Sequence, residues 1–390
     1  MKITLKTVKR IIAVVMTAIL LFSLASCKDN PAKNADEIVV PEKKVAILVA
    51  PEAQYPEDYR AAQELAAEYP DTIIVKEYED SRILKGGNPG IMTLSDELAN
   101  NPEIGAIIYA RATQFTRNAI YNAKQINPNL ITVCIEPEEK LSEMSDLADL
   151  VYAVDWAKAA DDIVAQAKAQ GAKYFVAFAI PRTLGGTLVS EQISALEKAC
   201  NTHGLTYIYK NSEDTNKSTQ IAGAQKFIKE AVARLYLNKE VEGNAVALYS
   251  ADSSVQSTLI EQAEARELIY VCPSFPTAYN GIGEVYEIAA PEKVSDVAAY
   301  IKSAKSSVKE NASGKANLSI YKNPLATILL KGAVHSTFDL LNGTMTAENM
   351  AEKAPVRVQV AADSKDFTVV AHAEYTNIYI AYQPGFEELR

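Results

Sequence analysis

The sequence predicts an α/β protein made of two consecutive lobes, each built on a doubly wound parallel sheet. Three observations support this. Short apolar runs alternate with amphipathic stretches, the runs are nearly continuous in apolar character, and the same rhythm starts again after a helix that Gly171 closes. Strands buried on both faces have this continuous character. Alternation of strand and helix favours right-handed βαβ crossovers in a parallel sheet.

Each lobe has its own set of expected elements. In the first, strands are expected over 44–50, 72–78, 105–110, 130–135 and 150–154, with helices over 57–68, 93–100 and 115–126. A helix over 157–170 is expected to start the second lobe. In the second, strands are expected over 174–180, 205–209, 244–249 and 268–272, with helices over 187–201, 219–235 and 253–266. The lobes are therefore expected to span 44–155 and 156–276.

The chain after residue 276 breaks this rhythm. Helices are expected over 292–305 and 325–341, a loop at 311–314, and strands over 356–360 and 376–382, where apolar residues alternate. We expect part of 277–345 to complete the first lobe and part of 346–390 to complete the second.

The N-terminus has the pattern of a secretory signal. Four basic residues precede a short apolar stretch that ends in Leu24-Ala25-Ser26-Cys27. A positive start, an apolar centre and small residues before a cut site are typical of signal peptides, and the Leu-Ala-Ser-Cys ending resembles a bacterial lipobox. The interpretation is a signal peptide over 1–26, a lipidated Cys27, and a flexible tether over 27–43 that holds the protein on the outer side of a membrane. An uncleaved anchor needs about 20 apolar residues, which this stretch lacks, and a plain secretory signal with a chance cysteine is the other alternative.

Charge and motifs exclude several functions. Four of the 39 basic residues lie in the signal, so the remaining chain has 35 basic and 49 acidic side chains, which disfavours nucleic-acid binding. The histidines at 203, 335 and 372 have no metal-ligand spacing, and the chain has no Cys-x-x-Cys, Gly-x-Ser-x-Gly or Walker sequence. Gly86-Gly87-Asn88-Pro89-Gly90 indicates a turn before a helix. We therefore expect no enzyme activity, metal or cofactor, and buried thiols at Cys134 and Cys272.

Ligands of parallel α/β sheets gather at the carboxyl ends of the strands, beside helix N-termini. This rule nominates a set of loop residues as ligand contacts. In the first lobe they are Gln54, Tyr55, Arg111, Gln114 and Glu136, and in the second Arg182, Thr183, Asp214, Ser250, Asp252, Ser274 and Phe275.

Arg111 and Arg182 each follow directly on a predicted strand, one in each lobe. A guanidinium presents five donors in a fixed fork, so two opposed arginines would favour a ligand with an anionic or strongly accepting group. The alternative is that each arginine pairs with a local acid, such as Glu136 or Asp214, and only shapes its lobe.

Other nominated residues have a structural alternative as well. Ser250, Ser253, Ser254 and Asp252 can either cap a helix or donate to a ligand at the same helix end. Tyr55, Phe275 and Tyr279 can stack on a ring or pack the interior. Trp156 falls where the chain crosses between the lobes, and the sequence does not decide between packing the crossing and lining a ligand site.

The size of the chain, its secretory signal, its two consecutive βαβ lobes and its crossing tail carry a first resemblance to known proteins. Three stretches carry a second, closer one: Ala179-Ile180-Pro181-Arg182, Ala222-Gly223-Ala224-Gln225-Lys226-Phe227-Ile228 and Cys272-Pro273-Ser274-Phe275. From about Lys44 to its C-terminus the chain resembles type I periplasmic-binding proteins, in which two Rossmann-like lobes joined by hinge strands close on a small ligand. It is more closely similar to an uncharacterised family of bacterial lipoproteins of that fold, catalogued as a domain of unknown function. The resemblance implies the fold and leaves the ligand open.

The function expected from these observations is a lipid-anchored solute-binding protein. It would close on a small polar ligand, anionic if the arginines contact it, and deliver it to an ABC-type permease or a sensor in the membrane. The alternatives are a non-catalytic surface interaction protein that keeps the fold without binding a small molecule, and a hydrolase of an extracellular polymer. A cytosolic repressor has the least support, because no basic helix-turn-helix segment is present.

Overall fold

Two sheets organise the part of the chain that the structure describes. This computed structural model describes residues 38–52, 54–79, 87–180, 187–211, 220–274, 277–311, 314–363 and 366–390, and the fold below is that of Val39–Arg390. The predicted signal peptide and Cys27 lie outside the described residues. The α/β class with two mostly parallel sheets, predicted from the sequence, is confirmed.

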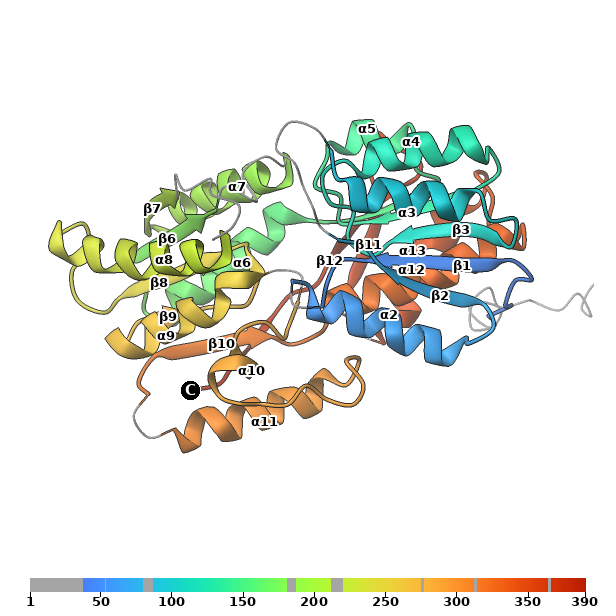
Figure 1. Ribbon diagram of the computed structural model, residues 1–390. Coiled ribbons are helices and arrows are strands. Elements are labelled where there is room, and N and C mark those ends of the chain that lie inside the picture. Colours follow the sequence, from blue (N-terminus) through green and yellow to red (C-terminus); the bar gives the residue numbers. More distant parts are fainter. Residues whose placement is uncertain are drawn as a thin grey trace, which may run out of the picture. The chain divides into compact units, whose positions relative to one another are not determined.

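The first lobe has a seven-stranded sheet among the described residues, in the order β11-β12-β5-β4-β3-β1-β2 (Figure 1). Its strands are β1 (Lys44–Val49), β2 (Ile73–Glu77), β3 (Ile104–Tyr109), β4 (Ile131–Ile135), β5 (Leu150–Val154), β11 (Thr368–Ala371) and β12 (Ile378–Tyr382). All neighbours are parallel except β11 and β12. The strands from β1 to β5 have nearly continuous burial, as a sheet covered on both faces requires.

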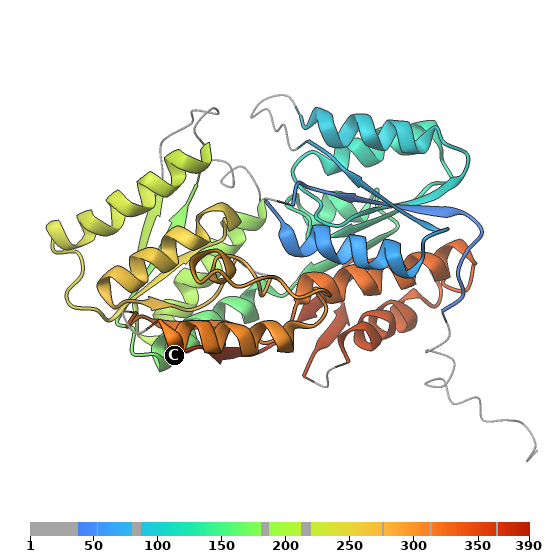
Figure 2. The ribbon, with the colours of Figure 1, turned by 60° about the horizontal axis from the view of Figure 1, so that its bottom comes forward.

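Helices cover both faces of this sheet. They are α2 (Pro56–Glu68), α3 (Pro89–Ala99), α4 (Thr116–Ile126), α5 (Leu141–Ser145), α12 (Leu325–Leu341) and α13 (Met350–Ala362). Figures 1 and 2 show α3 and α4 on one face, and α2, α12 and α13 on the other. Pro56 opens α2 directly after the loop that follows β1, so the turn after β1 is fixed by a residue suited to the first position of a helix.

The second lobe repeats the plan. Its described sheet has the order β13-β10-β9-β8-β6-β7, with β13 antiparallel and the other neighbours parallel. The strands are β6 (Tyr174–Ala179), β7 (Thr206–Asn211), β8 (Val246–Ser250), β9 (Ile269–Tyr270), β10 (Asn317–Tyr321) and β13 (Phe386–Glu388). The helices are α6 (Trp156–Ala169), α7 (Thr187–His203), α8 (Gln220–Leu237), the short η2 (Ser253–Val255), α9 (Gln256–Arg266), α10 (Ile282–Val285) and α11 (Val297–Glu310).

Three connecting segments join the lobes. The chain passes from β5 to α6 at Asp155, from β10 to α12 over 322–324, and from β12 to β13 over 383–385. Asp155 N–H donates to the Ala381 carbonyl at 2.9 Å, and Lys322 N–H donates to the Gly385 carbonyl at 3.3 Å. The three connections therefore run side by side.

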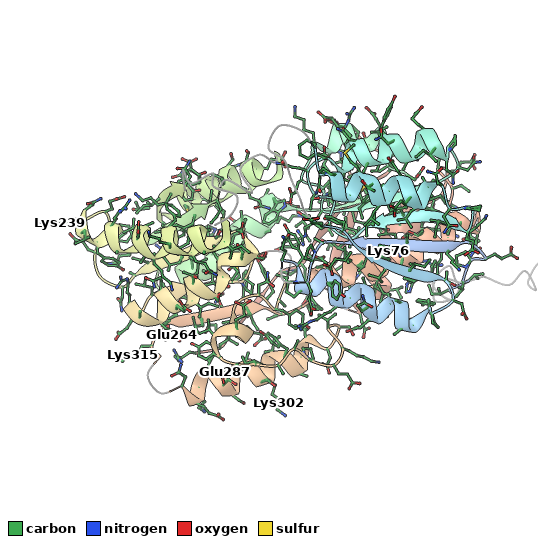
Figure 3. The ribbon with its side chains drawn as sticks, in the orientation of Figure 1. Lys76, Lys239, Glu264, Glu287, Lys302 and Lys315 are labelled. Atoms are coloured by element: carbon green, nitrogen blue, oxygen red, sulfur yellow. The ribbon has the colours of Figure 1, made fainter. Side chains whose placement is uncertain are left out.

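The tail after residue 276 contributes elements to both lobes. Within 277–345, α12 packs on the first sheet, but α11 and β10 belong to the second lobe. Within 346–390, β13 joins the second sheet, but β11 and β12 extend the first. Glu264 ties the end of the chain to the second lobe, because it accepts from the Lys315 backbone N–H at 2.8 Å and pairs with Arg390 at 2.8 Å (Figure 3).

The strand predicted over 356–360 is wrong, because these residues belong to α13. Val356 and Val360 are exposed and Val358 is buried, so the apolar residues two apart do not share a face. The buried side is instead spaced by four residues, at Met350, Ala354 and Val358. Val358 packs directly on Gly332 of α12. A Cβ added at Gly332 would lie 2.5 Å from Val358 Cγ2, so this contact needs a glycine.

Both cysteines predicted to be buried are buried free thiols. Cys134 lies in β4, as expected, and Cys272 lies two residues beyond β9. Across the described ranges no helix combines the length and apolar character needed to cross a bilayer.

Candidate functional site

The carboxyl ends of β1, β3 and β4 bring the nominated residues of the first lobe together. Arg111 is 9% exposed and lies at the end of β3. Its Nε and Nη2 donate to Asp58 Oδ2 at 3.3 and 3.2 Å, and its guanidinium lies over the Tyr55 ring at 4.7 Å from the centroid. The structure thus realises the local-acid alternative, with Asp58 in the first turn of α2 as the acid.

Burial alone would lower the pKa of Arg111, but the carboxylates around it, Asp58 first and then Glu136 and Glu138, raise that pKa above its ordinary value. Burial raises the pKa of Asp58, and the charge of Arg111 opposes this shift. The pair is therefore a desolvated ion pair, whose members depend on one another.

Glu136 is the more deeply buried of the two nominated acids that the structure describes, at 1% exposure against 2% for Asp252. It has a left-handed backbone, with φ of 49°, directly after β4. Its Oε1 accepts a hydrogen bond from Trp156 Nε1 at 2.8 Å. Burial raises the pKa of the Glu136 carboxyl to about 7. Trp156 therefore packs beside the first crossing and also contacts a candidate ligand residue.

Three buried polar atoms at these strand ends have no hydrogen-bond partner among the described residues. They are Gln54 Oε1 after β1, Gln114 Nε2 after β3, and Glu136 Oε2 after β4. Two are acceptors and one is a donor, so together they present a mixed hydrogen-bonding surface. A buried polar atom without a partner costs about 1–3 kcal/mol, which indicates that something other than these side chains satisfies them.

The nominated residues of the second lobe that the structure describes are occupied within their own loop. Ser250 Oγ accepts from Asp252 N–H at 3.2 Å. Asp252 Oδ1 accepts from the backbone N–H of Ser254 at 2.9 Å and from its hydroxyl at 2.5 Å. Ser274 Oγ accepts from Asn280 Nδ2 at 2.9 Å. The capping alternative therefore accounts for Asp252. Arg182, Thr183, Asp214 and Phe275 lie outside the described residues.

The two lobes meet through the same loops. Ser253 Oγ donates to the Gln54 carbonyl at 2.5 Å. Glu57, beside Asp58 on α2, accepts from Ala278 N–H of the second lobe and from Thr327 N–H and Oγ1 at the start of α12, all at 3.0 Å. Burial raises the pKa of Glu57 to about 7. Glu57 and Asp58 are functional candidates that the sequence reasoning missed, because acids in a first helical turn usually need no further explanation.

A small cavity lies at the strand ends of the second lobe. It is lined by side chains of β6, α7 and β8, including Gln192 and Tyr249, and its volume is about 10 Å³. Gln192 Oε1 and the Tyr249 hydroxyl, both buried, have no partner in the described part of the chain. A volume of about 10–15 Å³ holds one water molecule, so this cavity is too small for a solute.

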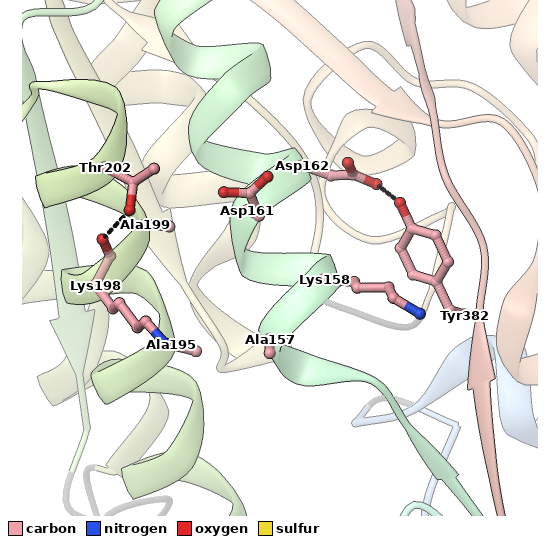
Figure 4. Close-up of a pocket in the computed structure, with 9 residues that line it drawn as sticks. All are labelled: Ala157, Lys158, Asp161, Asp162, Ala195, Lys198, Ala199, Thr202 and Tyr382. Carbon is pink, nitrogen blue, oxygen red and sulfur yellow. Dashed lines mark hydrogen bonds between the residues drawn. The ribbon is translucent and has the colours of Figure 1, made fainter. Parts of the chain in front are cut away.

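Two larger pockets lie elsewhere. One, of about 340 Å³, lies between α6, α7 and Tyr382, where the Tyr382 hydroxyl donates to Asp162 (Figure 4). The other, of about 500 Å³, lies between α2, α12 and residues 292–295. Neither includes a nominated residue. Among the residues described, no group of three or more His, Cys, Asp and Glu side chains is placed to hold a metal ion.

Comparison with protein families identifies the chain. Residues 43–318 match the family model described as protein of unknown function DUF3798. The chain belongs to the DUF3798 family. The uncharacterised family expected from the sequence is thereby confirmed, while no curated protein matches the chain.

Solved structures confirm the fold. A candidate transcriptional regulator from Clostridium difficile 630 is similar with a TM-score of 0.65 at 16% identity, over 90% of this chain and 99% of that chain. An ABC transporter solute-binding protein from Clostridium phytofermentas with bound L-rhamnose gives a TM-score of 0.54 at 9% identity, over 90% and 96%. A sugar-transport substrate-binding protein from Bordetella parapertussis 12822 gives a TM-score of 0.55 at 8% identity, over 91% of this chain and 92% of that chain. The DUF3798 chain thus has a fold found in type I periplasmic-binding proteins and in regulators.

Proposed function

We propose that this DUF3798 protein is a non-catalytic solute-binding protein that holds a small polar molecule at the carboxyl ends of its strands. The observation that carries the proposal is a set of three buried atoms without a hydrogen-bond partner among the described residues, namely Gln54 Oε1, Gln114 Nε2 and Glu136 Oε2. They come from three strand ends of one sheet, where α/β folds bind ligands. A solute with hydroxyl or amino groups would offer the complementary donors and acceptors.

Contacts between the lobes support closure as the binding step. The Ser253–Gln54 and Trp156–Glu136 hydrogen bonds join second-lobe groups to two of the three residues that carry the proposal. A solute that contacts these residues has a higher affinity for the state in which the lobes meet, and so shifts the population toward it.

The proposal includes an anchor outside the cell. Its support is the signal-like start that ends in Leu24-Ala25-Ser26-Cys27. Cys27 would carry the lipid, and the bound solute would pass to a permease or sensor in the same membrane. Radiolabelled palmitate should label the wild-type chain and not a Cys27→Ala variant, which should also leave the membrane fraction. Equal labelling of both chains would overturn the anchor.

Solute binding is tested by thermal unfolding of the purified protein with sugars, nucleosides, amino acids, amines and organic acids, followed by calorimetry on any hit. A solute that binds the native state raises the melting temperature. Gln54→Ala and Gln114→Ala should each weaken binding about tenfold, since each removes a hydrogen bond worth about 1 kcal/mol or more.

The matched control is Gln170→Ala. The Gln170 amide also has no partner among the described side chains, but it lies at the end of α6 and not at the strand ends. This variant should bind as the wild type does. A folded protein that responds to no member of the panel would instead favour the surface interaction protein.

A further inference from the structure

The charges at the first-lobe strand ends do not favour an anionic solute. Arg111 is already matched by Asp58, at 3.2 Å, with the side chains 10% and 5% exposed. Using Arg111 to bind an anion would leave Asp58 buried beside the anion's charge. The guanidinium that suggested an anionic ligand in the sequence is therefore committed to its own lobe.

The carboxylates around this pair outnumber the cation. Glu136 is 1% exposed and Glu138 is 9% exposed, and both act electrostatically on Arg111. Glu138 Oε2 also accepts from the Gln114 backbone N–H at 3.3 Å. The charged groups that act electrostatically on Glu136 are thus one guanidinium, that of Arg111, and two further carboxyls, those of Asp58 and Glu138.

One of these carboxyl oxygens is buried and has no partner in the described structure. Glu136 Oε1 is held by Trp156, and Glu136 Oε2 is not bonded. The left-handed backbone at Glu136 and the Trp156 hydrogen bond fix this side chain from both ends, so Oε2 has little freedom to seek another partner. Glu136 follows β4 at the same edge of the sheet where Gln54 follows β1 and Gln114 follows β3.

Resting on the solute-binding function proposed above, we propose that the solute carries a protonated amine, and that its ammonium group pairs with Glu136 Oε2. An ammonium is a compact donor of three hydrogen bonds. It would supply the charge that Arg111 cannot and would fill the vacant acceptor at once. Gln54 Oε1 and Gln114 Nε2 would then contact the neutral polar part of the same molecule.

The same arrangement disfavours the other two charge classes. An anionic solute would meet Glu136 and Glu138 with no uncommitted cation among the described residues at this end to offset them. A neutral solute could donate to Glu136 Oε2, but it would leave the excess negative charge in place. Because the site is desolvated, opposite charges interact there more strongly than in water.

Matched compounds that differ in charge test the proposal. The panel pairs glucosamine with glucose and glucuronate, and putrescine with 1,4-butanediol and succinate, and it is extended by native mass spectrometry of any molecule that co-purifies. In any set that shows binding, we expect the amine to bind at least tenfold more tightly than the neutral compound and the acid not to bind. Glu136→Gln should abolish this preference.

Glu103→Gln is the matched control. It removes the same single charge from an exposed acid at the other end of β3, where Glu103 pairs with Lys44 at 2.7 Å. This variant should keep the preference for amines. If the tightest or the co-purified ligand is neutral or anionic, the amine proposal fails while the solute-binding function stands. If no molecule of any class binds or co-purifies, both fail.

A measurement without ligand tests Glu136 directly. Since burial raises the pKa of Glu136 from 4.5 to about 7, the ligand-free fold loses stability as the pH rises through this window, and the loss is complete above it. Glu136→Gln should therefore unfold at about the wild-type temperature at pH 5 and a few degrees higher at pH 8. A variant less stable than the wild type at pH 8 would show that both carboxyl oxygens have structural partners, and would overturn the proposal.

Discussion

The strand ends of the two lobes have similar residue types but differ in how these residues are bonded. In the second lobe, Ser250, Asp252 and Ser274 hydrogen-bond to atoms of their own loops. In the first lobe, Gln54, Gln114 and Glu136 each keep a buried atom without a partner in the described chain. Polar loop residues at the same place in a repeated fold can thus be bonded within their loop or keep an atom without a described partner, and we propose ligand contact only for the second kind.

The contrast extends to charge. At the first-lobe strand ends the buried ion pair Arg111–Asp58 lies beside Glu136 and Glu138. At the second-lobe strand ends the described acid, Asp252, is 2% exposed and accepts two hydrogen bonds as the cap of η2. Among the described strand-end residues, buried charges therefore cluster in the first lobe, and the variants below measure the difference.

The largest effect is expected for Arg111→Ala. This change leaves Asp58 buried without its cation, which costs about 3–5 kcal/mol of unfolding free energy. Chemical denaturation at pH 7 measures the loss. The paired variant Arg111→Met with Asp58→Leu should recover most of it, because two apolar side chains replace the whole pair. A loss below about 1 kcal/mol for Arg111→Ala, the range of exposed pairs, would contradict a desolvated site.

A second comparison uses two glutamates of equal burial. Glu57 and Glu136 are each 1% exposed, and burial raises the pKa of both to about 7. Between the ordinary value near 4.5 and pH 7, each native carboxyl holds a proton that the unfolded chain has lost, so its contribution to stability falls as the pH rises through this window. Replacing either glutamate by glutamine removes this loss of unfolding free energy. The loss amounts to up to about 3 kcal/mol, at 1.36 kcal/mol per pH unit.

The unfolding free energies of the two variants should differ by an amount that does not change with pH. The two Glu57 carboxyl oxygens accept hydrogen bonds from Ala278 and Thr327. In Glu57→Gln the amide NH2 group, which can only donate, replaces one of these oxygens. The lost hydrogen bond lowers the unfolding free energy by about 1–3 kcal/mol at every pH. Glu136→Gln has no such cost at Oε2. Denaturation at pH 5 and pH 8 should therefore give two parallel changes, with Glu57→Gln the less stable variant throughout. Curves that coincide would mean that hydrogen bonding does not distinguish the two sites.

Most of the fold and part of the candidate site could be predicted from the sequence. Continuous apolar runs such as Ile131–Ile135 and Leu150–Val154 predict buried strands directly, because few other structures bury every residue. The helical content of 356–360 was missed because a valine at every second position mimics a strand, while the face that packs on Gly332 repeats every four residues. Periodicity cannot choose when a segment fits both patterns.

The nominated residues that the structure describes lie in loops after strands, as predicted, but the sequence did not predict their hydrogen-bond partners. Arg111 was expected to contact either a ligand or a local acid such as Glu136, and the acid it pairs with is Asp58, 53 residues earlier in the chain. That contact depends on how β1 and β3 lie beside one another, and the local sequence around Arg111 does not record it. The side-chain atoms without partners can be recognised only when the neighbouring strands are in place.

The smallest expected effect belongs to Asp252→Ala in the second lobe. Its side chain caps η2, and loss of a capping side chain typically costs about 1 kcal/mol. Asp296→Ala is the matched control, because Asp296 caps α11 through Ala299 N–H at 3.2 Å, away from the strand ends. The two variants should lose similar unfolding free energy, and solute affinity measured by calorimetry should stay within about twofold of the wild type in both. A tenfold loss of affinity for Asp252→Ala alone would correspond to about 1.4 kcal/mol of lost contact with the solute. It would show that the cap also binds the ligand, so that both lobes contribute to a site that we propose for the first lobe alone.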